Sequence, residues 1–232
     1  MNNDIESVDH STVKLYQSNA DDLTVARAAW VSQSPEADER EAEPGRVEGL
    51  IRYLMRNQHM SCFEHCHMTF VIDTPIFVAR QIMRHRSSAF NEWSARYSEM
   101  RPRFYTPYTN GRPLVQSGKI GHYTFEQGSF HQGEHVDEAI EEVSKTAWGC
   151  YEDMLSDGIA KEVARMVLPV NTMTTFWMTT NVRNLLHFLD LRNDDHAQYE
   201  VREVARQMED LLASEMPMTY AAYKQINTKE EA

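Results

Sequence analysis

The chain has 232 residues and an ordinary globular composition, with 41% hydrophobic and 25% charged residues and a net charge of −12. This charge argues against sequence-independent binding of nucleic acid, no apolar run is long enough to span a membrane, and the acidic N-terminus lacks the apolar core of a secretory signal. We therefore expect a cytoplasmic protein with reduced cysteines, formed by one domain over residues 1–232 with its core at about 12–220 and mobile polar ends.

The first 72 residues predict two strands and two helices. Alternating side chains predict strands near residues 13–16 and 68–72, and apolar spacing of three and four residues predicts helices near 22–30 and 47–54. Asp21 and Asp22 can cap the first helix. Residues 33–45 are rich in Pro, Glu and Asp and predict an exposed loop.

A third helix is predicted to start at Thr74-Pro75, with Thr74 as N-cap and Pro75 in the first turn. Its apolar positions predict that it runs to about Arg86. Residues 87–133 predict mostly irregular structure, with a short extended piece near Phe104-Tyr105.

Helices dominate the second half of the predicted structure. They are expected at about 134–157, 159–167, 182–191 and 195–215. Cys150 lies on the apolar stripe of the first of these and is predicted to be in the core. Few strands among many helices favour an α+β fold, with a modest sheet covered by helices and a helical C-terminal part.

The densest group of polar side chains lies between Arg84 and Tyr97. Six arginines fall within 24 positions of an otherwise acidic chain: Arg80, Arg84, Arg86, Arg96, Arg101 and Arg103. Because arginine matches phosphate and carboxylate geometry, this island predicts a local anion pocket. On the predicted helix, Arg84, His85 and Arg86 would point about 100° apart, so they would serve two ligands or two subunits. For any single arginine, an intramolecular salt bridge is the alternative.

This segment resembles the signature of flavin-dependent thymidylate synthases. The resemblance rests on Arg84-His85-Arg86 followed by Asn91-Glu92-x-Ser94-x-Arg96-Tyr97, and it extends over roughly residues 20–215. Other matching segments are His59-x-Ser61-x-Phe63-Glu64-His65, Pro75–Gln81, Ala164–Pro169, Asn181-x-Arg183, His187, Leu191-Arg192 and His196-Ala197-Gln198.

The resemblance implies a thymidylate synthase-complementing fold and reductive methylation of dUMP to dTMP, in de novo dTMP biosynthesis. The carbon donor would be 5,10-methylenetetrahydrofolate, and NADPH would reduce a bound FAD. It also implies a homotetramer in which several subunits form each active site. No protein cysteine would attack the pyrimidine, which agrees with the setting of the three cysteines, Cys62, Cys66 and Cys150.

The resemblance also assigns site residues. It implies dUMP ligands at Gln81, Arg84, Ser94, Arg96, Arg165 and Arg192. Among them, Arg192 would be the catalytic residue that polarises the uracil ring. It implies FAD contacts at Ser32, His59, Arg84, His85, Arg86, Glu92, Asn181, Arg183 and His187. No metal is predicted. Glycines are not arranged as G-x-G-x-x-G, so we do not expect a Rossmann mode of binding FAD.

Two of these assignments depart from the family pattern. Trp30, beside Ser32, stands where relatives commonly have a small polar or basic residue, and His187 stands where many have Asn.

Three alternatives remain open from the residues alone. His59, Cys62, His65, Cys66 and His67 are zinc-type ligands within nine positions, although strand alternation separates Cys66 from its neighbours. The same scaffold could transfer a hydroxymethyl group without full reduction. It could also be a non-catalytic nucleotide or flavin sensor.

Overall fold

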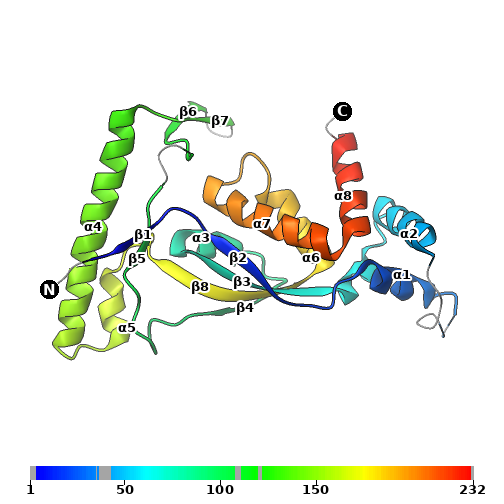
Figure 1. The fold of residues 1–232 in the computed structure, drawn as a ribbon, viewed down its shortest axis with the longest axis horizontal. Coiled ribbons are helices and arrows are strands. Elements are labelled where there is room, and N and C mark those ends of the chain that lie inside the picture. The colour runs from blue at the N-terminus through cyan, green and yellow to red at the C-terminus, as the bar shows by residue number, and fades with distance from the viewer. Residues whose placement is uncertain (1–3, 35, 37–42, 108–110, 120–121, 231–232) are drawn as a thin grey trace.

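An antiparallel four-stranded sheet forms the centre of an elongated molecule (Figure 1). The computed structural model describes residues 4–34, 36, 43–107, 111–119 and 122–230. The strand order is β2-β3-β8-β4. The strands are β2 (Thr12–Ser18), β3 (His67–Pro75), β8 (Met173–Asn181) and β4 (Ala89–Glu92). The predicted α+β fold with a modest sheet covered by helices is confirmed.

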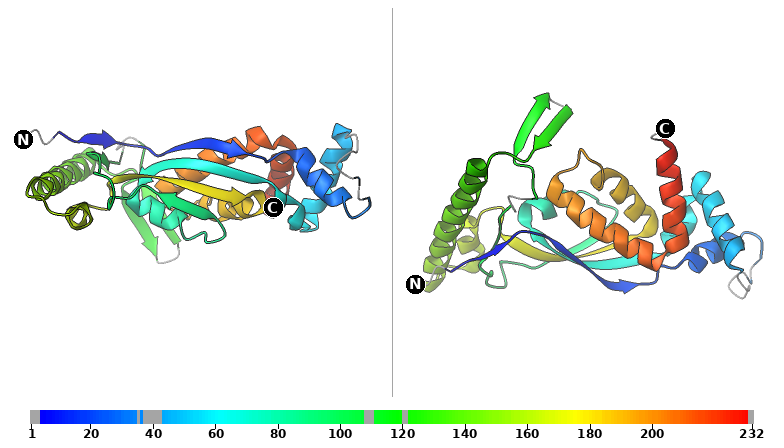
Figure 2. Two further views of the ribbon diagram at one scale, coloured as in Figure 1. Left: turned by 90° about the horizontal axis from the view of Figure 1, so that it is seen from below. Right: turned by 45° about the horizontal axis from the view of Figure 1, so that its top comes forward.

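Helices cover one face of the sheet and extend the molecule at both ends (Figures 1 and 2). The covering helices are α3 (Ile76–Ile82), α6 (Val182–Arg192) and α7 (Tyr199–Glu215). One end is formed by α1 (Asp22–Trp30), α2 (Pro44–Arg56), the 3-10 helix η2 (Met60–His65) and α8 (Pro217–Glu230). The other end holds α4 (Phe130–Ser156), α5 (Lys161–Ala164) and the 3-10 helix η3 (Arg165–Val167). No helix in the described part of the chain is long and apolar enough to cross a membrane.

The core lies between the sheet and its helices. Alternate residues of β3, including Phe70 and Ile72, are fully buried. They stand opposite Met178 and Phe176 of β8, which are also fully buried. Each such side chain contributes roughly 1.5–3 kcal/mol through burial. The opposite face of the sheet carries exposed side chains, such as Trp177 at 42%.

The central strand β8 was not predicted from the sequence. On its buried face, Phe176 and Met178 are flanked by two threonines, Thr174 and Thr180, that are each only 2% exposed. Buried threonines remove the contrast between apolar and polar positions on which strand prediction depends. The pattern of this strand is therefore visible only once β3 is known to pair with it.

Helix α3 starts later and ends earlier than predicted. Thr74 belongs to β3, and its buried hydroxyl lies 2.7 Å from the hydroxyl of Ser11, so it does not cap the helix. The helix ends at Ile82, and the chain from Arg84 to Ser88 follows in turns, with the Ser88 amide donating to the His85 carbonyl. The predicted extension of this helix to Arg86 is wrong.

Residues 87–133 contain more strand than predicted. The expected extended piece is β5 (Arg103–Tyr105), which pairs in parallel with β1 (Glu6–Val8). The hairpin of β6 (Val115–Lys119) and β7 (His122–Glu126) projects from the body of the molecule (Figure 2). The polar ends contain β1 and the last residues of α8. The predicted loop at 33–45 falls largely outside the described residues.

Helix α4 begins at Phe130, four residues before its predicted start. Ser129 and Gln132 form a capping box, in which the Gln132 amide donates to the Ser129 hydroxyl. The buried residues of this helix include Trp148 and Tyr151, which pack toward Phe104 of β5. Cys150 lies off this narrow aromatic face and is exposed, so its predicted place in the core is wrong.

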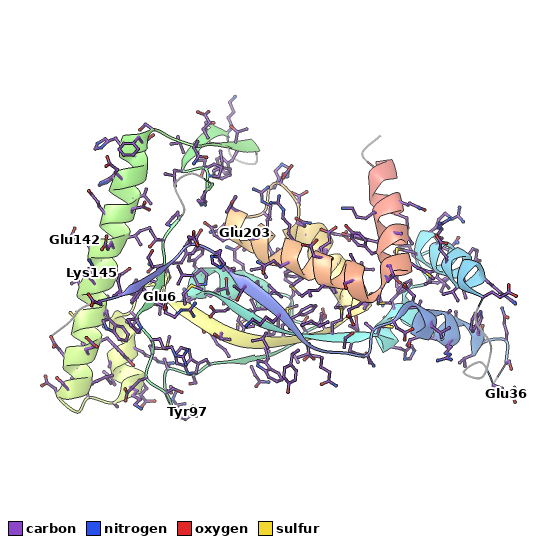
Figure 3. The ribbon with its side chains drawn as sticks, viewed as in Figure 1. Glu6, Glu36, Tyr97, Glu142, Lys145 and Glu203 are labelled. Atoms are coloured by element: carbon purple, nitrogen blue, oxygen red, sulfur yellow. The ribbon has the colours of Figure 1, made fainter. Side chains whose placement is uncertain are left out.

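The outer side of α4 is polar. Glu142 and Lys145 project from the side of the helix that faces away from the rest of the chain (Figure 3). Both side chains are exposed, as expected for a helix that packs against the protein on one face only.

Helix α8 was not predicted, and its N-terminus is fixed by a residue almost two hundred positions earlier. The carboxylate of Asp22 accepts hydrogen bonds from the amides of Met218 and Thr219, at 2.8 and 2.9 Å, and from the Thr219 hydroxyl. Asp22 and Thr219 are buried. This carboxylate therefore satisfies free amides at the start of α8 and joins α8 to α1.

We predict that Asp22→Ala lowers the free energy of unfolding by about 2 kcal/mol, because three donors, two of them buried, lose their acceptor. Urea denaturation at fixed protein concentration measures this change. Asp210→Ala on the exposed side of α7 is the control and should stay within about 0.5 kcal/mol of the wild type. Equal stability of the two variants would contradict the proposed anchoring of α8.

Candidate active site

A pocket of about 690 Å³ lies where α3 and α6 end. Its described lining consists of Arg80, Gln81, Arg84, Arg86 and Arg192. A guanidinium group donates hydrogen bonds and carries a fixed positive charge. Four of them around one pocket repel one another unless an anion lies between them. In a chain with a net charge of −12, this pocket is a concentrated site for an anionic ligand.

The sheet explains why these arginines meet. Because β3 and β8 are antiparallel, α3 and α6 start at opposite ends of the sheet and run toward each other over its covered face. Their lengths of about 10 and 16 Å nearly span the roughly 30 Å of a nine-residue strand. The turn after α3 contributes Arg84 and Arg86, and the last residue of α6 is Arg192. A cation at this helix end is also favoured by the helix dipole.

The early end of α3 changes the expectation for Arg84–Arg86. On a continuous helix Arg84 and Arg86 would diverge, but in the turn both line the same pocket. His85 is directed elsewhere. Its Nε2 accepts a hydrogen bond from Nε of Arg192 at 3.0 Å, and its ring packs edge-on against Phe188 of α6.

The contact with Arg192 requires an uncharged imidazole. Burial, followed by the charges of Arg192 and His187, lowers the pKa of His85 to about 4. A neutral His85 with a free lone pair on Nε2 can hold the Arg192 guanidinium, whereas a protonated His85 would repel it. The other guanidinium donors of Arg192 remain available to the pocket.

A second pocket of about 450 Å³ holds two further predicted residues, Arg165 and Glu92. Arg165 stands on η3 and is exposed, and the carboxylate of Glu92 accepts a hydrogen bond from the Thr174 hydroxyl at 2.8 Å. Arg80 lines this pocket as well as the first. The two pockets therefore adjoin one another at Arg80.

A third pocket, of about 440 Å³, contains two of the predicted flavin contacts. Arg183 and His187 stand one turn apart on α6, and the pocket is closed by residues of α2, η2 and α8. Arg183 also forms an ion pair with Glu64 of η2. The lining mixes cationic, amide and apolar side chains, with Met55 and Ile226 among the apolar ones, and it includes one carboxylate, Asp190, which accepts a hydrogen bond from the Tyr223 hydroxyl. Such a surface fits a ligand with an aromatic ring and a negative charge.

Two predicted nucleotide ligands line none of these three pockets. Ser94 is half-buried, and its hydroxyl accepts the Arg96 amide at 3.3 Å. Arg96 is exposed and forms an ion pair with Glu162 at 2.8 Å. Beside it, Tyr97 projects from the edge of the molecule, away from the sheet (Figure 3). These residues face outward from the single chain.

Three predicted flavin contacts also lie outside the pockets. Ser32 is exposed after α1, where its hydroxyl donates to the Ala29 carbonyl at 2.8 Å. His59 is exposed before η2, with its ring near that of Tyr53. Asn181 is the N-cap of α6 and accepts the Asn184 amide at 2.9 Å. The contact of Asn181 gives it a structural role in addition to the predicted one.

The alternative metal site at residues 59–67 finds no support in the geometry. Among the described residues, no three His, Cys, Asp or Glu side chains are grouped so that they could hold a metal ion. Cys66 is buried and directs its thiol to the Asp21 carbonyl, whereas His65 and His67 are exposed.

Two residues at the arginine pocket were not assigned to the site from the sequence. Arg80 was noted only as part of the basic island, yet it precedes Arg84 by four residues, a spacing that places side chains on one side of a helix. Gln198 was noted in a matching segment, and its carboxamide oxygen accepts a hydrogen bond from Gln81. Only the tertiary structure shows this second contact, because 117 positions separate the two residues.

Comparison with known proteins identifies the family. The model of the family described as thymidylate synthase complementing protein matches residues 14–218. A flavin-dependent thymidylate synthase of Streptomyces coelicolor is 44% identical over 222 residues, which cover 91% of this chain and 90% of that protein. The chain belongs to the family of flavin-dependent thymidylate synthases. Proteins of the same name from Tropheryma whipplei and Thermotoga neapolitana are 40% and 38% identical over more than nine tenths of this chain.

Solved structures agree with this assignment. The crystal structure of a UMP/dUMP methylase, PolB from Streptomyces cacaoi, bound with 5-Br UMP superimposes with a TM-score of 0.87 and 42% identity, covering 95% of this chain and 96% of that one. The same methylase bound with 5-Br dUMP gives a TM-score of 0.88 at 42% identity, with coverages of 95% and 97%. The fold and the sequence therefore identify the same family.

We predict that His85 stays neutral down to about pH 4 in the folded protein, which NMR titration of its ring protons measures directly. The unfolded chain binds this proton near pH 6.5, so His85 makes the free energy of unfolding fall as the pH drops from 6.5 toward 4. His85→Phe keeps the ring contact with Phe188 and should lose this part of the pH dependence. A folded-state titration near pH 6.5 would contradict the prediction.

Proposed function

We propose that this chain is an FAD-dependent thymidylate synthase. It would convert dUMP to dTMP with 5,10-methylenetetrahydrofolate as carbon donor and NADPH as reductant of FAD, in de novo dTMP biosynthesis in the cytoplasm. The observation that carries the proposal is the pocket lined by four arginines and Gln81, in a chain that belongs to this family. The UMP/dUMP methylase of the same fold, solved with 5-Br dUMP bound, supports a uracil nucleotide as the substrate class.

The arginine pocket suits a nucleoside monophosphate. Arg80, Arg84 and Arg86 can neutralise the phosphate, for which the guanidinium fork is suited. Arg192, held by His85, directs a fixed cation into the same pocket. Placed against a uracil carbonyl, it would stabilise negative charge on the carbonyl oxygen when carbon 5 of the ring takes on the carbanion character that makes it nucleophilic.

The third pocket and the arginine pocket have side chains that fit FAD. Arg183 and His187 supply donors for an anionic or polar group, and the apolar lining around Met55 and Ile226 suits a flat ring. Arg84 and Arg86 can contribute to the binding of its phosphates. When bound, FAD supplies the redox chemistry, which protein side chains cannot provide.

The cysteines support a reaction without a thiol nucleophile. Burial raises the pKa of Cys66 to about 11, so its thiol is protonated at neutral pH. Burial also raises the pKa of Cys62. Cys150 lies exposed on α4 and belongs to none of the three pockets described above. The proposed mechanism therefore activates the pyrimidine through Arg192 rather than through covalent attack by a cysteine.

A homotetramer with shared sites would bring in the residues that face outward. Ser94 and Arg96 line none of the pockets that hold Arg84 and Arg192, although the resemblance implies that all four bind dUMP. If they bind dUMP, they do so in the site of a neighbouring copy. The ion pair of Arg96 with Glu162 is exposed, so exchanging it for a ligand would cost little.

A second candidate function is methylation of UMP. The matching crystal structures are of a UMP/dUMP methylase, one of them bound with 5-Br UMP, at nearly the same identity as the thymidylate synthases. Parallel assays with dUMP and UMP separate a thymidylate synthase from a methylase that accepts both sugars.

We predict that the purified protein has the visible spectrum of oxidised flavin. Anaerobic NADPH should bleach this spectrum faster in the presence of dUMP, and addition of methylenetetrahydrofolate should yield dTMP. Hydroxymethyl-dUMP as the final product would instead support transfer without full reduction. A protein that stays colourless after incubation with FAD would overturn the proposed function.

We predict that Arg192→Ala lowers kcat by at least about 100-fold while FAD remains bound, because the change removes a donor that acts on the developing charge. Arg183→Ala is the matched control on the same helix and should weaken FAD binding instead. Single-turnover dTMP formation and equilibrium dialysis of FAD measure the two effects. Full activity of Arg192→Ala would contradict its proposed role.

A further inference from the structure

A chain of hydrogen bonds runs from a buried carboxylate to the arginine pocket. Glu200, near the start of α7, is only 2% exposed, and its Oε2 accepts a hydrogen bond from Nε2 of Gln198 at 2.9 Å. The side-chain oxygen of Gln198 in turn accepts from Nε2 of Gln81. Glu203, which is labelled in Figure 3, lies one turn after Glu200 on α7. It shows the reader the end of α7 from which these hydrogen bonds start.

The direction of this chain follows from Glu200. An ionised carboxylate can only accept hydrogen bonds, so the amide NH2 of Gln198 must face it. The carbonyl of Gln198 then faces Gln81, and only the NH2 group of Gln81 can meet it. Two amides that could each adopt either orientation are thus both fixed by one acceptor.

Two further donors bind the Glu200 carboxylate. Arg112 donates from Nε to Oε1 of Glu200 at 2.8 Å, and the hydroxyl of Tyr105 donates to the same oxygen at 3.2 Å. Burial, followed by the charge of Glu200, raises the pKa of Tyr105, so this hydroxyl remains a donor. The carboxylate therefore has a positive partner and three donors in a buried setting.

These hydrogen bonds determine which donors and acceptors the arginine pocket offers to a ligand. Of the five described lining residues, the four arginines can only donate hydrogen bonds, and Gln81 alone offers a side-chain acceptor. With its NH2 group committed to Gln198, the free oxygen of Gln81 is available to the pocket. A uracil nucleotide presents mostly acceptors, namely its phosphate and two ring carbonyls. Its donors, N3–H and the sugar hydroxyls, have no partner among the arginines.

We propose that Glu200 and Gln198 are positioning residues that present the carboxamide oxygen of Gln81 to a hydrogen-bond donor of the bound nucleotide. This inference rests on the proposed function, because it takes dUMP as the ligand of the arginine pocket. It adds two residues to the site, neither of which lines the arginine pocket. It also gives the pocket a means of rejecting nucleotides that lack the donor.

The test compares dissociation constants of dUMP, 3-methyl-dUMP and 2′,3′-dideoxy-UMP, measured by calorimetry on the FAD-loaded protein. The first analogue lacks N3–H and the second lacks the sugar 3′-hydroxyl. In the wild type, one of them should bind at least about tenfold more weakly than dUMP, the factor that corresponds to one hydrogen bond. That analogue identifies the donor that Gln81 accepts.

Two variants break the chain of hydrogen bonds at different points. Gln198→Leu removes the intermediate amide, and Glu200→Gln keeps the shape but no longer dictates which way the amides face. In both variants, the analogue that binds tenfold more weakly than dUMP to the wild type should bind only about twofold more weakly, or less. Gln198→Leu leaves Glu200 bound to Arg112 and Tyr105, so this variant still tests the proposal if Glu200→Gln does not fold.

Arg112→Met is the matched control. This variant breaks the ion pair with Glu200 but leaves the Glu200 carboxylate as the acceptor for Gln198. It should therefore lower the melting temperature, as Glu200→Gln does. The analogue should still bind at least about tenfold more weakly than dUMP. A penalty that is unchanged in both Gln198→Leu and Glu200→Gln would overturn the positioning role. Failure of the wild type to bind dUMP at all would instead overturn the proposed function, and with it this inference.

Discussion

The pairing of β3 with β8 determines where the chemistry of this protein is located. Each strand is followed directly by a helix that returns over the same face of the sheet, and the antiparallel register makes the two helices approach each other. The site therefore forms where two helix ends meet. Its cations lie over the two central strands of the sheet, whose covered faces carry fully buried side chains such as Phe70 and Phe176.

Arginine side chains that lie close together repel one another, so their contacts decide whether each charge stays directed into the pocket. Arg192 is held by a neutral imidazole rather than by a carboxylate, so its charge remains directed into the pocket. Acidic residues nearby are used elsewhere: Glu200 binds Arg112, and Glu64 binds Arg183. The pocket thus keeps its positive potential within a strongly acidic chain, which favours entry of an anionic substrate.

The sequence predicts much of this arrangement but not its centre. Helices with clear spacing, such as α1 and α7, and strands with clear alternation, such as β2 and β3, were identified before the structure. The basic island also pointed to an anion site. The sequence does not predict β8 because buried threonines hide its alternation, and it misplaces the start of α3 because Thr74 belongs to the sheet instead of capping the helix. Contacts such as Gln81 with Gln198 depend on tertiary packing and have no local signal.

The order of the strands along the chain has a consequence for synthesis. β3 is made early, but its partner β8 leaves the ribosome roughly a hundred residues later, which at ordinary translation rates is about 5–20 seconds. Until then β3 lacks its second neighbour strand, β8, and its apolar face lacks the helices α6 and α7 that cover it. The nascent chain is therefore exposed to aggregation during this interval, and chaperone binding to the segment around Met68–Ile72 would protect it.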